Sequence, residues 1–296
     1  MRFEKRILVA IKGSGDLQAV VQRARLIAER LRAEVILMPA SRSLQSQAVE
    51  RTQQALLQLQ EAGLQVTVRE RQHRNLLADL VLSAKELECG LLIKAPDRPR
   101  GLSDALMTPR DWKLLRYAPC PVLMIKQGGS WVRRPLLAAV DAAPGDGAHR
   151  ELNLKILQLA GMIAGLSECP LELVSAYPAP MQSSDPVHQS AEQLASRYRE
   201  QAVLLCTQAG VKPQALHIDA GPAETLIPRL AAQREAGLVV LGTVARRGLS
   251  AALMGGNTAE AILERLPGDI LTVQPEVSDE VLALLAQAAS SEEVSV

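Results

Sequence analysis

The sequence predicts an α/β fold made of two tandem, open, parallel five-stranded sheets with helices on their faces. Short apolar runs alternate with stretches of helical periodicity, which is typical of parallel sheets wound by right-handed crossovers. The pattern also occurs twice. Residues 89–95 in the first half resemble residues 236–242 in the second, and each run precedes a loop, a short helix and another apolar run. Such repetition indicates a duplicated domain.

The first half opens with a continuous apolar run at 7–11, as expected of a strand covered on both faces. The turn at 12–15 ends this strand, and Asp16 is a suitable N-cap for a helix that continues to Leu31 with apolar residues at helical spacing. The same criteria predict the remaining elements in this order: strand 34–39, polar helix 45–61, β-branched strand 66–68, helix 76–87, and strands 89–95 and 121–126.

The second half repeats this order. A strand is predicted at 136–140, and the helix at 151–166 carries Leu152, Ile156 and Leu159 on one face. The further elements are strand 171–176, helix 191–208, strand 215–218, helix 223–234, which Pro222 could start, and strands 236–242 and 269–274. These elements predict domains at 1–128 and 133–276, a Gly-rich linker at 127–130 and a C-terminal tail at 277–296.

Composition excludes several classes of function. The 296 residues suffice for two domains, and the net charge of +1 with interspersed signs does not favour nucleic-acid binding. Aromatic residues make up only 2%, which argues against base-stacking platforms. The four cysteines and four histidines are dispersed, so we expect buried thiols and no metal site. No run has the length of a signal peptide or membrane span, and we expect a cytoplasmic protein.

Ligands of open parallel sheets bind at the carboxyl ends of the strands, where the winding reverses. The most suggestive loop there follows the strand that ends near Leu241. It contains glycines at the end of the strand and a Gly-Gly-Asn-Thr stretch at the start of a helix, and helix N-termini of this kind can bind phosphate. In the alternative interpretation, the glycines shape a loop and a polar residue caps the helix. The candidate site residues are Asp141, Ala176, Gly242, Thr243, Ala245, Arg246, Gly255, Gly256, Asn257 and Thr258.

The spacing of Gly242, Ala245 and Gly255-Gly256 resembles the glycine signature of the universal stress protein family. In the first half, residues 108–116 and 120–124 are similar to the tandem, E-type members of that family. The resemblance covers nearly the whole chain except the last twenty residues. It implies the universal stress protein fold, which is like that of the adenine nucleotide alpha hydrolases, with two sandwiches related by a pseudo-twofold axis.

Some members of the family bind ATP or AMP and others do not. By resemblance, Asp141 would lie near the adenosine, and Gly242 and Gly255 would hold ribose and phosphates. The chain departs from the signature at Ala245, where a second glycine is usual, and at Gly256, where Ser or Thr is usual and for which Thr258 could substitute. A methyl group forced into a packed contact costs about 1–3 kcal/mol, or roughly ten- to hundred-fold in affinity.

The first copy departs further from the signature. Lys12 replaces the aspartate, residues 95–97 replace the Gly-rich start of the loop, and Pro109 removes a backbone donor at the helix entrance. We therefore expect no nucleotide in the first domain.

No nucleophile with a neighbouring base and orienting group is visible, so the leading hypothesis is a non-catalytic stress-response protein. It would act by binding or assembly in survival of stress or DNA damage, with no obligatory cofactor and weak ATP or AMP binding in the second domain only. One alternative is a slow ATPase or nucleotide-gated switch. Another is a carrier of an apolar small molecule or lipid, with a cavity bordered by residues 178–186 and 281–285. The two domains are expected to pair within one chain, as a monomer or homodimer, with other universal stress proteins as candidate partners.

Overall fold

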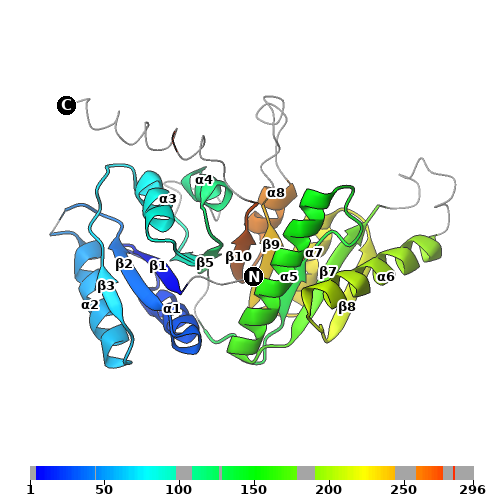
Figure 1. Cartoon of the computed structure of the whole chain (residues 1–296), viewed down its shortest axis with the longest axis horizontal. Helices are drawn as coiled ribbons and strands as arrows, with labels where there is room; N and C mark the ends of the chain where they lie inside the picture. Colours follow the sequence, from blue (N-terminus) through cyan, green and yellow to red (C-terminus); the bar gives the residue numbers. More distant parts are fainter. Residues whose placement is uncertain are drawn as a thin grey trace. The chain divides into compact units, whose positions relative to one another are not determined.

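The computed structural model describes residues 5–43, 45–97, 109–126, 129–178, 191–243, 258–275 and 283. The chain divides into two compact units, an N-terminal unit within residues 2–129 and a C-terminal unit within residues 130–275. Each is an α/β sandwich with five parallel strands, as the sequence predicts (Figure 1). The predicted domain boundaries stay a prediction, and the tail at 277–296 lies outside the described residues apart from Ala283.

In the N-terminal unit the parallel strands lie in the order β3-β2-β1-β4-β5. Its elements are β1 (Arg6–Ile11), α1 (Leu17–Leu31), β2 (Glu34–Pro39), α2 (Gln47–Glu61), β3 (Val66–Val68), α3 (Leu76–Glu86), β4 (Leu91–Lys94), α4 (Pro109–Tyr117) and β5 (Val122–Met124).

The C-terminal unit repeats this topology with the strand order β10-β9-β6-β7-β8. Its elements are β6 (Leu136–Ala139), α5 (Gly147–Ser167), β7 (Leu171–Tyr177), α6 (Ala191–Ala209), β8 (Ala215–Ala220), α7 (Ala223–Gln233), β9 (Leu238–Gly242), α8 (Thr258–Arg265) and β10 (Asp269–Val273).

The central strands are apolar apart from Arg6 at the start of β1 and Lys94 at the end of β4, because helices cover both faces of each sheet. α1 packs beside α2 and α3 beside α4, while α5 packs beside α6 and α7 beside α8. In each unit the first two crossovers move outward from the first strand and the third returns across it. With right-handed crossovers, this reversal puts the two helix pairs on opposite faces (Figure 1). Strands β1, β4, β6 and β9 are consequently buried along their length, except for Arg6 at the start of β1 and Gly242 at the end of β9.

Side-chain caps fix several helix starts. Asp16 accepts a hydrogen bond from the N–H of Ala19, as the predicted N-cap should. In α5 the cap is Asp146, which accepts the N–H of His149. This helix therefore begins at Gly147, four residues before the predicted start, because its first turn is polar and shows no apolar periodicity.

Trp131 anchors the start of the C-terminal unit. Its indole Nε1 donates to Asp269 Oδ2 at 2.9 Å, and both side chains are buried. Its carbonyl oxygen accepts a bond from the Cys169 thiol at 3.0 Å. A Cβ at Gly237 would lie 3.2 Å from the indole ring, so the absence of a side chain at Gly237 leaves room for the indole to pack against the main chain.

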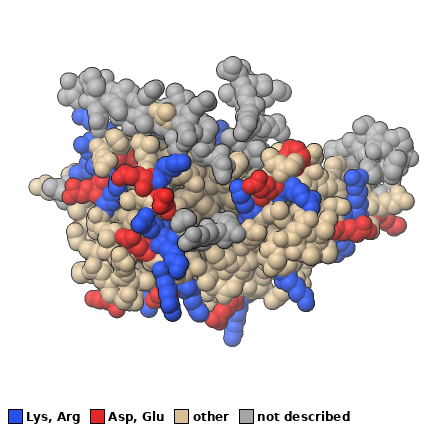
Figure 2. Space-filling view, viewed as in Figure 1, with Lys and Arg blue, Asp and Glu red and all other residues tan. Residues whose placement is uncertain are grey.

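Acidic and basic side chains stand beside one another over both units in the view of Figure 2, as expected for a net charge of +1. Among the described helices, none combines the length and the apolar character needed to cross a membrane.

Candidate functional site

The winding of the C-terminal unit reverses between β6 and β9. The chain runs from β6 outward to β7 and β8 and then returns to place β9 on the other side of β6. Ala139 of β6 pairs with Val174 of β7 on one side and with Leu241 of β9 on the other, and these three residues form one row across the sheet. Two residues beyond that row, Ala176, Asp141 and Thr243 follow one another across the carboxyl ends of the neighbouring strands β7, β6 and β9. This is the place where open parallel sheets bind ligands.

The predicted site residues within the described part of the chain have different environments. Asp141 is exposed, Ala176 is half-buried near the end of β7, and Thr258 is the first residue of α8. Thr243 is buried, and its N–H donates to the carbonyl oxygen of Val273 at 2.9 Å. The remaining predicted residues lie outside the described residues, namely Ala245, Arg246, Gly255, Gly256 and Asn257.

Gly242, at the end of β9, has a packing role. A Cβ built there would lie 2.7 Å from Leu152 Cδ2 and 3.2 Å from Ile156 Cδ1, both on α5. Real Cβ atoms do not approach so closely, so the glycine allows α5 to lie against the strand end. On this side of Gly242 the neighbour is a helix rather than open space.

Two buried polar side chains that the sequence analysis did not single out hold the main chain around Asp141. They are Asn153 on α5 and Ser175 on β7. A sequence signal did exist, because Asn153 directly follows Leu152 on a helix face that is otherwise apolar.

Two of the three tyrosines of the chain lie near Asp141. The rings of Tyr177, at the end of β7, and Tyr198, on α6, have centroids 5.5 Å apart and a tilt of 44°. Burial and the negative charge of Asp141 raise the pKa of Tyr198 above its ordinary value. The carboxyl edge of the sheet thus carries an aromatic pair beside its acidic residue.

At the corresponding place in the N-terminal unit, between β1 and β4, ion pairs fill the strand ends. Lys12 Nζ lies 2.9 Å from Asp97 Oδ1 and 2.6 Å from the carbonyl oxygen of Pro96. Lys94 Nζ lies 2.9 Å from the same Asp97 oxygen and 2.6 Å from Asp111 Oδ1 on α4. We call Lys12, Lys94, Asp97 and Asp111 the switch-point cluster.

The switch-point cluster is deeply buried at Lys94 and Asp111, while the side chains of Lys12 and Asp97 are 15% and 25% exposed. The side chains of Lys94 and Asp111 are 3% and 0% exposed. Asp111 Oδ2 also accepts the N–H of Asp97 at 3.0 Å. Burial alone would raise the pKa of Asp97, but Lys94 and Lys12 together hold it below its ordinary value. Two ammonium groups and two carboxylates thus neutralise one another inside the protein.

Comparison with known proteins identifies the family. The model of the universal stress protein family matches residues 134–274. A solved structure from Pseudomonas aeruginosa UCBPP-PA14, described as a putative universal stress protein, is 36% identical; the match covers 97% of this chain and 98% of that one, with a TM-score of 0.75. The chain belongs to the universal stress protein family. Universal stress protein E of Photorhabdus laumondii is 29% identical over 302 residues, which is 91% of this chain and 95% of that protein. Because this match spans both halves, the chain is a tandem universal stress protein of the E-like type.

A universal stress protein structure from Archaeoglobus fulgidus has the same fold at 12% identity, with a TM-score of 0.61 over 92% of this chain. Universal stress protein E of Escherichia coli K12 is 27% identical over 310 residues, covering 93% of this chain and 96% of that protein. The predicted family and fold are both confirmed.

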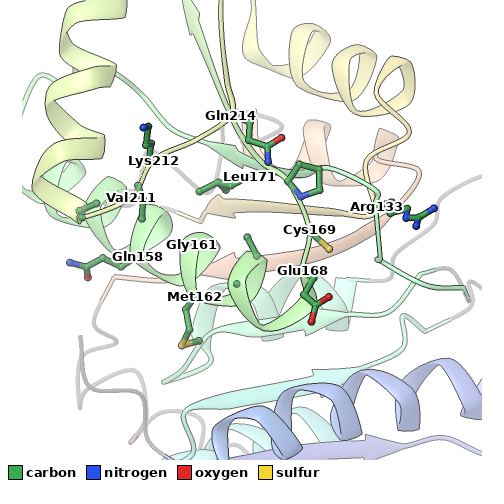
Figure 3. Close-up of a pocket in the computed structure, with 15 residues that line it drawn as sticks. Arg133, Gln158, Gly161, Met162, Glu168, Cys169, Leu171, Val211, Lys212 and Gln214 are labelled. Carbon is green, nitrogen blue, oxygen red and sulfur yellow. The ribbon is translucent and has the colours of Figure 1, made fainter.

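This universal stress protein also has a hollow of about 900 Å³ at the opposite, amino-terminal edge of the C-terminal sheet. It lies between the ends of α5 and α6 (Figure 3). Charged and amide side chains contribute much of its wall: Arg133, Gln158, Glu168, Lys212 and Gln214. Such a lining does not favour an apolar ligand. The cavity expected beside residues 178–186 and 281–285 falls almost entirely outside the described residues.

No disulfide joins the four cysteines, all of which the structure describes, and burial raises the pKa of Cys89 to about 11. Burial likewise raises the pKa of Cys120 and Cys206. Within the described ranges, no group of three or more His, Cys, Asp and Glu side chains could hold a metal ion.

Proposed function

We propose that this protein is a non-catalytic, cytoplasmic stress-response protein that acts by binding and assembly, and that its C-terminal unit alone binds ATP or AMP weakly. Membership of the universal stress protein family supports the stress-response role. Survival of DNA damage is the part of that role we would test first.

The observation that carries the nucleotide proposal is the difference between the two switch points. In the N-terminal unit, Lys12 pairs with Asp97, and Lys94 pairs with both Asp97 and Asp111. In the C-terminal unit, Asp141 is exposed at the end of β6, beside β9. One copy therefore supplies an accessible hydrogen-bonding group at the place where the other has an internal ion cluster.

Calorimetry on the stripped, full-length protein tests this proposal. At millimolar ATP or AMP, we expect one nucleotide per chain. The Asp141→Ala variant should lose at least about ten-fold in affinity, as expected for a hydrogen bond to a charged group. Lys12→Ala is the matched control at the other switch point and should leave the stoichiometry and affinity unchanged. Two nucleotides per chain, or no heat at millimolar concentration, would show the nucleotide assignment to be wrong.

Two further measurements address the wider proposal. Phosphate release by the same sample separates a binding protein from a slow ATPase, and we expect none above the rate without protein. Deletion of the coding sequence should lower survival in stationary phase and after DNA damage. Equal survival of the deletion strain would contradict the stress-response role even if nucleotide binds.

A further inference from the structure

The loop that follows β6 is held by an unusual set of hydrogen bonds. Asn153 Oδ1 accepts the N–H of Asp141 at 3.3 Å, and Asn153 Nδ2 donates to the carbonyl oxygen of the same residue at 2.7 Å. The side-chain amide thus bonds to both main-chain groups of Asp141, as a peptide group of a neighbouring strand would. The N–H of Ala142 donates to Ser175 Oγ at 3.0 Å, and the N–H of Ala143 donates to Asp141 Oδ1 at 3.0 Å.

Both supporting side chains are removed from water. Asn153 is 4% exposed and Ser175 is 0% exposed. Burying an amide or a hydroxyl costs free energy unless its hydrogen bonds are satisfied. Here the partners are the main chain of one loop, so these polar residues stabilise the conformation of that loop rather than the core in general.

The N-terminal copy offers an internal comparison. The two helices end alike, since the left-handed caps Arg32 and Glu168 donate to the carbonyl oxygens of Ala28 and Ala164. Counting back from these caps places Leu17 where Asn153 lies in the second copy. Pro39 pairs with Ile11, the residue before Lys12, and so has the position that Ser175 has beside Val140. Neither Leu17 nor Pro39 has a side-chain hydrogen-bonding group. The polar supports thus accompany the acidic loop and are missing where a lysine replaces the aspartate.

Three consecutive N–H groups, those of residues 141, 142 and 143, are therefore bonded within the protein. A loop whose N–H groups are already used cannot bind a phosphate through them. What it offers at the end of β6 is a carboxylate, which accepts hydrogen bonds and repels anions.

Resting on the proposed function, we infer that Asn153 and Ser175 are the positioning residues of the nucleotide site. They fix the Asp141 loop and use its N–H groups, which leaves its carboxylate for the hydrogen-bond donors of the ligand and not for its phosphates. This agrees with the place near the adenosine that the family resemblance gives Asp141, and the new element is the positioning role of the two buried side chains. The phosphates must then be bound by other parts of the site.

The test combines a ligand-free and a ligand-bound measurement on the full-length protein. Amide hydrogen exchange reports the loop without nucleotide. Asn153→Leu should lower the protection of the Asp141 amide, and Ser175→Ala that of the Ala142 amide, by about ten-fold each, as expected for one lost hydrogen bond. Ser167→Ala is the matched control, because it removes a buried hydroxyl of α5 that bonds within its own helix. It should leave both amides unchanged.

Calorimetry then compares AMP, adenosine and tripolyphosphate. Both variants should weaken AMP and adenosine by about ten-fold, with Ser167→Ala at the wild-type value and tripolyphosphate binding unchanged in all three. Equal nucleotide affinity in wild type and both variants would overturn the inference while the proposed function stood. Loss of tripolyphosphate binding in step with AMP would overturn the assignment of the loop to donor groups. If wild type binds no nucleotide, the proposed function fails. The inference about the site then fails with it, even if hydrogen exchange shows that Asn153 and Ser175 protect the loop amides.

Discussion

Removal of the Asp111 carboxylate should destabilise the N-terminal unit strongly. Its Oδ1 lies 2.6 Å from Lys94 Nζ, with both side chains buried. Breaking a buried ion pair from one side costs about 3–5 kcal/mol, because the remaining charge is left in a poorly solvating environment. Asp97, also 2.9 Å from Lys94, keeps part of the compensation, so we expect about 3 kcal/mol for Asp111→Ala. For a unit of this size that corresponds to a Tm lower by about 10 °C.

The assay is thermal unfolding at pH 7 in the presence of either formate or chloride. Asp111→Ala leaves a carboxylate-sized space beside Lys94, and formate can enter it. If formate binds there with a Kd on the order of 10 mM, then about 100 mM formate restores about 1.4 kcal/mol, or about 5 °C. Asp111→Asn fills the same space with a neutral group and should gain nothing from formate. Glu29→Ala, which removes the exposed partner of Arg25, should change stability by less than about 0.5 kcal/mol.

Two results would refute this reasoning. One is an Asp111→Ala variant within about 1 kcal/mol of wild type, since a pair so buried cannot be lost at the cost of a surface contact. The other is a formate effect of equal size in the Ala and Asn variants, which would mean that formate stabilises the fold generally and does not occupy the space of the carboxylate.

Three other perturbations have definite expected outcomes. Asp141→Asn should lower the pKa of Tyr198 towards its ordinary value, because it removes a negative charge. Ultraviolet titration of the phenol measures this pKa, and an unchanged value would show that the Asp141 charge does not act on Tyr198. Arginine and histidine partners hold the pKa of Glu172 below 4.5 against the effect of burial, so its ion pairs stabilise the fold above that pH and are lost as pH falls through the lowered pKa. Glu172→Gln should therefore flatten the acid limb of stability measured by urea unfolding from pH 6 down to about pH 3; a parallel curve would contradict this. Gly242→Ala should cost about 1–3 kcal/mol through overlap with Leu152, and Leu152→Ala in the same chain should cost less than it does alone, since it makes room for the new methyl group.

The fold could be predicted because its determinants are local and repeated. A strand such as β4 is an apolar run bounded by turns, and its copy β9 appears at the matching place in the second half. The order of elements then fixes the parallel topology. Helix starts were less predictable. The first turn of α5 is polar, and only the hydrogen bond from His149 to Asp146 marks where the helix begins.

The candidate site could be predicted only in part. Strand ends locate Asp141 and Thr243, because parallel strands bring their carboxyl ends to one edge. The supports of the site could not be found in this way, since the bonds of the Asp141 loop to Asn153 and of Lys94 to Asp111 join residues 12 and 17 apart on different elements. Each of these pairs did leave a trace in the sequence, namely a polar residue within an otherwise apolar stretch.

The buried indole of Trp131 has a practical consequence for studies of folding. The chain has two tryptophans, and the other, Trp112, lies in α4 directly after Asp111. Each unit therefore carries its own intrinsic fluorophore. In Trp131→Phe the tryptophan emission reports unfolding of the N-terminal unit, and in Trp112→Phe it reports unfolding of the C-terminal unit. Comparing the two melting curves gives the order in which the units unfold, without separating them by proteolysis or truncation.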